Sequence, residues 1–121
     1  MALSQNKGTI MVEARNVNVA EAKTLLEEGA FLVDVREDNE WESGRAPSAT
    51  HIALSAVPDH LEEFPTDRTI VFVCRSGARS GRATKFLAEQ GRDAVNLEGG
   101  MLAWSAEGEP VVGDIDEPTI I

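Results

Sequence analysis

Residues 69–80 read TIVFVCRSGARS and contain the strongest strand pattern in this sequence. The first five residues are uncharged and mostly β-branched or aromatic, which is typical of a buried strand. A cysteine, Cys74, follows directly, residues 76–78 are small, and residues 79–90 have a helical pattern that stops before a glycine. The stretch therefore predicts a strand, a short loop and a helix, with Cys74 at the carboxyl end of the strand.

Apolar strand patterns and helical patterns alternate through most of the chain. Helices are predicted at residues 18–29, 37–43, 57–64, 79–90 and 100–107, and strands at residues 31–35, 51–54, 69–73 and 94–97. Asn18 and Glu21 have the spacing of a capping box at the start of the first helix. This alternation predicts an α/β fold with a mainly parallel central sheet of about five strands and helices on both faces.

The length of 121 residues is that of one domain. We expect an N-terminal extension at residues 1–15, the folded domain at residues 16–107 and an acidic C-terminal tail at residues 108–121. The tail contains no chemical motif, so we expect its removal to leave catalysis largely unchanged. Its apolar residues would need cover, however, which leaves open a second interpretation as a strap over the domain.

The charge of the chain is unevenly distributed. The formal net charge is −10, which disfavours nucleic acid as a partner. Five basic and no acidic residues nevertheless lie between Arg68 and Ala88, around Cys74. Cys74 is the only cysteine, so no intramolecular disulfide can form, and no segment has membrane-spanning length. We therefore expect a cytoplasmic protein without a membrane partner.

The position of Cys74 favours a reactive thiolate over an inert core thiol. Gly77 allows the loop backbone to turn its amide groups toward one point, and a helix N-terminus follows with its partial positive charge. Arg75 and Arg79 add full positive charges. These features lower the pKa of a thiol and favour an anion bound beside the sulfur.

Four motifs resemble those of the rhodanese-homology domain family. They occur in the family's order and spacing, between about Val17 and Trp104, and read LVDVRE (32–37), EWESGRAPSA (40–49), CRSGARS (74–80) and NLEGGMLAW (96–104). The second motif departs from the usual pattern, because Arg45-Ala46 replaces His-Ile and Ser48 replaces Gly. The departures lie outside the cysteine loop, at a position where they could alter the pocket rim.

The resemblance implies a single rhodanese-like domain that acts as a thiosulfate or persulfide sulfurtransferase through a persulfide on the catalytic Cys74. It implies a small anionic sulfur donor, an acceptor that is cyanide, a thiol or a sulfur-carrier protein, and no metal or cofactor. Asp34 and Arg36 are expected to form an ion pair that supports the loop. The expected substrate-binding residues are Arg75, Ser76, Gly77, Ala78, Arg79 and Ser80.

Two other functions stay open at this point. Cysteine-dependent phosphatases also bind an anion between a cysteine and an arginine, and one group of them shares this fold. These phosphatases have five residues between the cysteine and the arginine. Only four residues separate Cys74 from Arg79. A non-catalytic rhodanese-like docking module is the other alternative, although inactive members generally lack the cysteine. The physiological donor and acceptor and the oligomeric state are not predicted.

Overall fold

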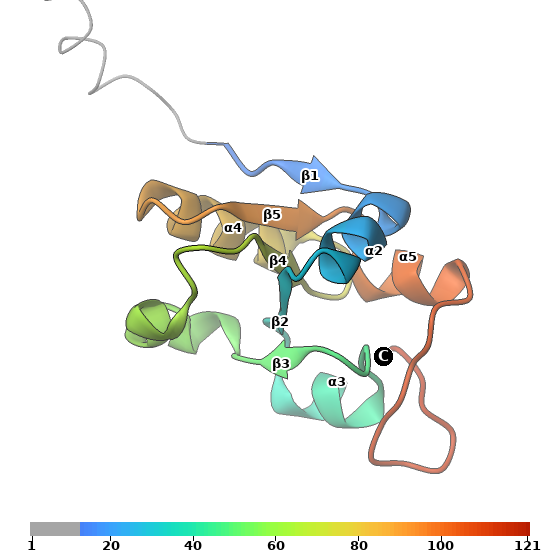
Figure 1. Cartoon of the computed structure of the whole chain (residues 1–121). Coiled ribbons are helices and arrows are strands. Elements are labelled where there is room, and N and C mark those ends of the chain that lie inside the picture. Colours follow the sequence, from blue (N-terminus) through green and yellow to red (C-terminus); the bar gives the residue numbers. More distant parts are fainter. Residues whose placement is uncertain (1–12) are drawn as a thin grey trace, which may run out of the picture.

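The strand that the sequence predicts most strongly, β4 (Ile70–Val73), lies at the centre of a five-stranded sheet. The computed structural model describes residues 13–121, in which the strand order is β1-β5-β4-β2-β3 and every pairing is parallel (Figure 1). The other strands are β1 (Asn16–Val17), β2 (Phe31–Asp34), β3 (Thr50–His51) and β5 (Ala94–Leu97). The predicted α/β fold is confirmed, and the carboxyl ends of its strands share one edge of the sheet.

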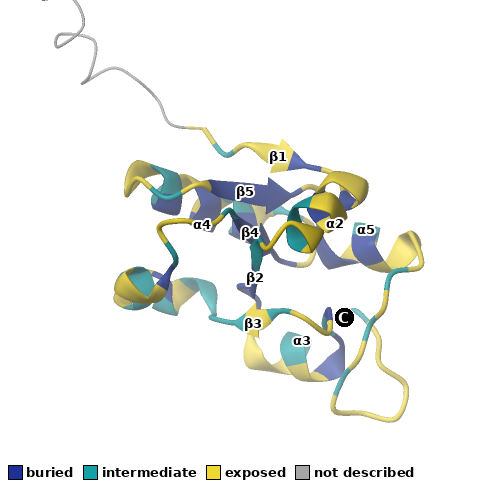
Figure 2. Ribbon diagram, in the orientation of Figure 1, coloured by how far each residue is buried: buried dark blue, intermediate teal, exposed yellow. Residues whose placement is uncertain are grey.

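Alternating side chains on β4 divide the core into two layers. Val71 and Val73 pack in the layer that contains buried residues of α2 (Val19–Glu27) and α5 (Gly100–Ala106). Ile70 and Phe72 pack in the opposite layer with α4 (Ala78–Glu89). The neighbouring strand β5 is buried along its whole length (Figure 2). Helices therefore cover both faces, as predicted.

The segment after β2 differs from the prediction. The helix expected at residues 57–64 is a 3₁₀ helix, η2 (Pro58–Glu63), and a second 3₁₀ helix, η1 (Leu54–Ala56), precedes it. Pro58 suits the first turn of a helix, but it has no N–H group to donate to the carbonyl of residue 54, so no single α-helix continues from η1 into η2. The strand expected at residues 51–54 is limited to β3, and α3 (Asp38–Ser43) precedes it.

The predicted capping box of α2 is present. The Asn18 side chain accepts a hydrogen bond from the Glu21 amide, and the Glu21 side chain accepts one from the Asn18 amide.

The two-residue strand β1 is too short to leave a pattern in the sequence. Residues 1–12 of the expected N-terminal extension lie outside the described residues. Within residues 13–121, no helix is long and apolar enough to cross a membrane.

The C-terminal segment, residues 110–121, lies against the domain and is called the strap below. Val112 pairs with Arg45 in an antiparallel bridge, and the Thr119 amide donates to the Ser43 carbonyl oxygen at 2.9 Å. The half-buried side chains of Val111 and Ile120 pack against the α2/α5 layer of the core. Of the two interpretations of this segment, the strap agrees with the structure.

Candidate active site

Cys74 lies at the carboxyl end of β4 and is only 1% exposed. The alternation along β4 directs its side chain into the layer that α4 covers. Its sulfur accepts a hydrogen bond from the Gly77 amide, at a Sγ–N distance of 3.1 Å. The Ser80 hydroxyl lies 3.2 Å from the same sulfur and can donate to it. The sulfur thus lies between a hydrogen-bond donor of the loop and one of the first turn of α4.

Glycine is needed at two positions around this loop. Gly77, the residue before α4, has a φ of +112°, a region that side chains disfavour. Gly100 has no room for a side chain, because a Cβ atom there would overlap the carbonyl groups of Cys74 and Arg75. The Met101 amide donates to the Cys74 carbonyl oxygen at 2.8 Å. The start of α5 therefore packs directly under the cysteine loop and fixes its backbone.

Two opposing influences act on the pKa of Cys74. Burial is the largest single influence and raises the pKa of the thiol. The hydrogen bonds from the Ser80 hydroxyl and from the amides of Ser80, Gly77 and Ser76 together outweigh burial, so the pKa is lowered below its ordinary value. The direction agrees with the prediction, and the loop amides contribute as expected, but the bond that lowers the pKa most comes from the Ser80 hydroxyl.

Asn96 on β5 connects the loop to the sheet. Its Nδ2 donates to Asn16 Oδ1 at 3.0 Å and to the Gly77 carbonyl oxygen at 3.1 Å, which uses both of its hydrogens. Its Oδ1 consequently faces the Ser80 hydroxyl, at 2.6 Å. In the sequence, Asn96 stands out only as the first residue of the NLEGGMLAW motif. The available signal was a polar residue within the otherwise apolar strand Ala94–Leu97.

Arg79 is held by a carboxylate of α3. Its Nη1 and Nη2 donate to Glu40 Oε1 and Oε2 at 2.7 and 2.8 Å. The hydrogen bond from Arg79 is the main reason why the pKa of Glu40 is lowered to about 2, and the same bond raises the pKa of Arg79. This bidentate pair clamps the first turn of α4 to α3, so the guanidinium of Arg79 serves as a support for the loop.

The remaining predicted binding residues lie on the outer side of the loop. Arg75, Ser76 and Ala78 are exposed. Arg75 Nε donates to the main-chain oxygen of Ile121 in the strap at 3.1 Å, and among the described residues no Asp or Glu side chain pairs with Arg75. Its charge is thus directed to the surface beside the loop.

Asp34 and Arg36 form a fully buried ion pair at the end of β2, with Arg36 Nη2 at 2.8 Å from Asp34 Oδ2. Arg36 Nη2 also donates to the Gly44 carbonyl oxygen. Within residues 13–121, the side-chain hydrogen bonds of this pair run to the end of α3 and not to residues 74–80. The pair positions α3, and α3 in turn supplies Glu40 to the loop.

A profile of the rhodanese-like domain family matches residues 18–107 of the chain. This chain belongs to the rhodanese-like domain family. YtwF of Bacillus subtilis is 43% identical over 101 residues, which are 82% of this chain and 98% of the relative. A protein named sulfurtransferase from Allochromatium vinosum is 42% identical over 86 residues, covering 70% of this chain and 80% of the relative. Thiosulfate sulfurtransferase GlpE of Pseudomonas syringae is 34% identical over 95 residues, covering 78% and 90%.

The solved structures agree with this assignment. A rhodanese-related protein from Thermoplasma volcanium superimposes with a TM-score of 0.75 at 31% identity, over 81% of this chain and 97% of that protein.

Within the rhodanese-like fold, this chain's departure at Arg45 has a structural role. Arg45 Nη2 pairs with Asp114 of the strap at 2.8 Å, and the guanidinium lies over the Trp41 ring. The substitution thus fastens the strap to α3.

Proposed function

We propose that this chain is a sulfurtransferase that moves sulfane sulfur from thiosulfate or a persulfide donor to a thiophilic acceptor through a persulfide on Cys74. The observation that carries the proposal is the buried Cys74 sulfur, which lies among donors from Ser76, Gly77 and Ser80 that lower its pKa. The sulfurtransferase names of the relatives support the same reaction type.

In the first half-reaction, the Cys74 thiolate attacks the outer sulfur of thiosulfate. A new S–S bond forms on Cys74, the S–S bond of thiosulfate breaks, and sulfite leaves with the bonding electron pair. The donors that hold the thiolate also suit the terminal sulfur anion of the persulfide, because backbone N–H groups stabilise charge without reorganising. In the second half-reaction, cyanide or a thiolate attacks the outer sulfur and releases the Cys74 thiolate.

Two features make this function fit better than phosphate hydrolysis. Only four residues separate Cys74 from Arg79, and both terminal nitrogens of Arg79 are bonded to Glu40. The pair with Glu40 neutralises the charge of Arg79, so Arg79 is a weaker partner for a doubly charged phosphoryl group. We also propose a cytoplasmic site of action, where reducing conditions would keep the single cysteine available.

The test is thiocyanate formation from thiosulfate and cyanide by the wild type and by Cys74→Ser. We expect turnover by the wild type and none by the variant, with far-ultraviolet circular dichroism showing that both are folded. Release of phosphate from an aryl phosphate, measured in parallel, is expected to be negligible. A Cys74-dependent phosphatase rate that equals or exceeds the sulfur-transfer rate would overturn the proposal.

A further inference from the structure

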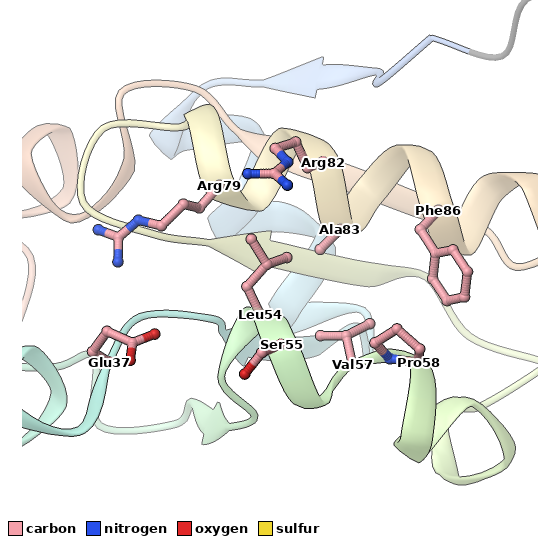
Figure 3. Close-up of a pocket in the computed structure, with 9 residues that line it drawn as sticks. All are labelled: Glu37, Leu54, Ser55, Val57, Pro58, Arg79, Arg82, Ala83 and Phe86. Atoms are coloured by element: carbon pink, nitrogen blue, oxygen red, sulfur yellow. The ribbon is translucent and has the colours of Figure 1, made fainter.

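A groove runs along α4 from the cysteine loop toward the opposite edge of the sheet. It has a volume of about 500 Å³ and is bordered by α4 on one side and by η1 and the start of η2 on the other (Figure 3). The lining residues of α4 repeat with the spacing of one helix face. The groove is lined by Glu37, Leu54, Ser55, Val57, Pro58, Arg79, Arg82, Ala83 and Phe86.

The groove begins beside the candidate active site, at Arg79, although none of residues 74–78 lines it. Arg79 lies in the first turn of α4, directly after the cysteine loop, and Glu37 follows the carboxyl end of β2. Figure 3 shows these two side chains at one end of the groove and Phe86 and Pro58 at the other. From residue 79 to residue 86, a helix advances about 10 Å. A molecule bound to the Cys74 loop can therefore extend into the groove.

The chemistry of the lining changes along this length. Near the loop, the positive charge of Arg79 is already paired with Glu40. Arg82 is exposed, lines the groove one turn further on, and has no ion-pair partner among the described residues. Beyond Arg82, the lining is apolar at Val57 and Phe86. The groove thus offers an unpaired arginine in the second turn of α4 and an apolar surface further along, with the exposed carboxylate of Glu37 at its loop end.

Thiosulfate is a small ion that would leave most of this groove to water. We propose that the groove binds the organic substituent of the sulfur donor, and that the donor is an amphipathic compound with an anionic sulfur-bearing head near Arg82 and an apolar body that reaches Phe86. This inference rests on the proposed function, and it makes Arg82 and Phe86 determinants of donor specificity.

Alkanethiosulfonates of increasing chain length test the inference, because each carries a sulfane sulfur on an anionic head. The Cys74 thiolate attacks the outer sulfur, a persulfide forms on Cys74, and the alkanesulfinate leaves with the electron pair of the broken S–S bond. With cyanide as acceptor, we expect kcat/KM of the wild type to rise roughly two- to fourfold for each methylene group that the groove buries. A value that does not change from the methyl to the octyl compound would overturn the inference.

Variants locate the effect in the groove. Ser55 is an exposed lining residue, so Ser55→Trp fills the groove without altering the core, and it should abolish the chain-length dependence of kcat/KM. Phe86→Ala should weaken the same dependence, and Arg82→Gln should raise KM for all the thiosulfonates. Lys85→Gln is the matched control, since it removes the same charge from α4 outside the groove. An unaltered chain-length dependence in Ser55→Trp would contradict the proposed location.

A binding measurement separates this inference from the proposed function. Octanesulfonate has the anionic head and apolar body but no sulfane sulfur, so its binding requires no turnover. Calorimetric titration should show binding to wild type and Lys85→Gln, and loss of binding in Ser55→Trp. Binding with this pattern, in a protein that forms no thiocyanate, would support the groove and overturn the sulfurtransferase proposal. Thiocyanate formation without octanesulfonate binding would support the sulfurtransferase proposal and overturn the inference about the groove.

Discussion

The Ser80 hydroxyl lies 2.6 Å from Asn96 Oδ1 and 3.2 Å from Cys74 Sγ, so its single proton has two acceptors. Asn96 cannot turn its amide group around, because both Nδ2 hydrogens are used by Asn16 and Gly77. When Cys74 is a neutral thiol, the proton of Ser80 can point to Asn96. When Cys74 ionises, the stronger acceptor is the thiolate. Ser80 thus stabilises the charged form of the sulfur.

The first prediction concerns Ser80→Ala. Loss of the hydroxyl removes the strongest of the hydrogen bonds that lower the pKa of Cys74, so this pKa should rise. The inflection in the pH dependence of Cys74 alkylation by a haloacetamide should therefore move to higher pH in the variant, because less of the sulfur is thiolate at a given pH. Ser105→Ala, on the exposed side of α5, is the control. Equal alkylation rates in wild type and Ser80→Ala would exclude this role of the hydroxyl.

The second prediction concerns the clamp between Arg79 and Glu40. Glu40→Gln should lower the free energy of unfolding by about 1–2 kcal/mol at pH 7, since the pair is only partly shielded from solvent. Because the pKa of Glu40 is about 2 in the folded protein, below its ordinary 4.5, the stabilisation is complete above pH 4.5 and is lost as the pH falls toward 2. Urea unfolding should therefore show the difference between wild type and variant shrinking over this range. Glu62→Gln, on an exposed position of η2, should show no such difference.

The third prediction concerns the strap. Ile120 packs against the core, whereas Ile115 in the same segment is 48% exposed. Ile120→Ser should lower the free energy of unfolding by about 1–2 kcal/mol, and Ile115→Ser should change it by less than about 0.5 kcal/mol. Thermal unfolding compares the two variants. Similar melting temperatures for both would mean that the strap does not contribute its apolar residues to the core.

The fourth prediction concerns Arg75, whose exposed side chain lies beside the cysteine loop. Arg75→Ala should raise KM for thiosulfate by roughly three- to tenfold with little change in kcat, because a charge that attracts the donor is removed. Arg68→Ala is a matched control, since Arg68 is an exposed arginine that precedes β4, at the opposite end of the strand. If both variants have the KM of the wild type, Arg75 does not bind the donor.

Local patterns predict the strands, the helices and the cysteine loop, because buried strands and capped helices leave signals within a few residues. The positions of Cys74 and Gly77 could be predicted for this reason. The bond between Glu40 and Arg79 and the bonds of Asn96 could not, since they join residues far apart in the sequence. They depend on the strand order, which brings α3 and β5 to the loop from opposite sides. The sequence does not decide between a tail and a strap, because the apolar residues of this segment show only that they need cover and not where they find it.

The proposed function depends on transfer of one sulfur atom to Cys74, and the mass of the intact protein measures this transfer directly. After incubation with thiosulfate and removal of excess donor, the wild type should gain one sulfur atom per chain and Cys74→Ser should gain none. Cyanide should then restore the original mass and release one equivalent of thiocyanate. A wild-type protein that gains no sulfur, or a Cys74→Ser variant that gains as much as the wild type, would contradict sulfur transfer through Cys74.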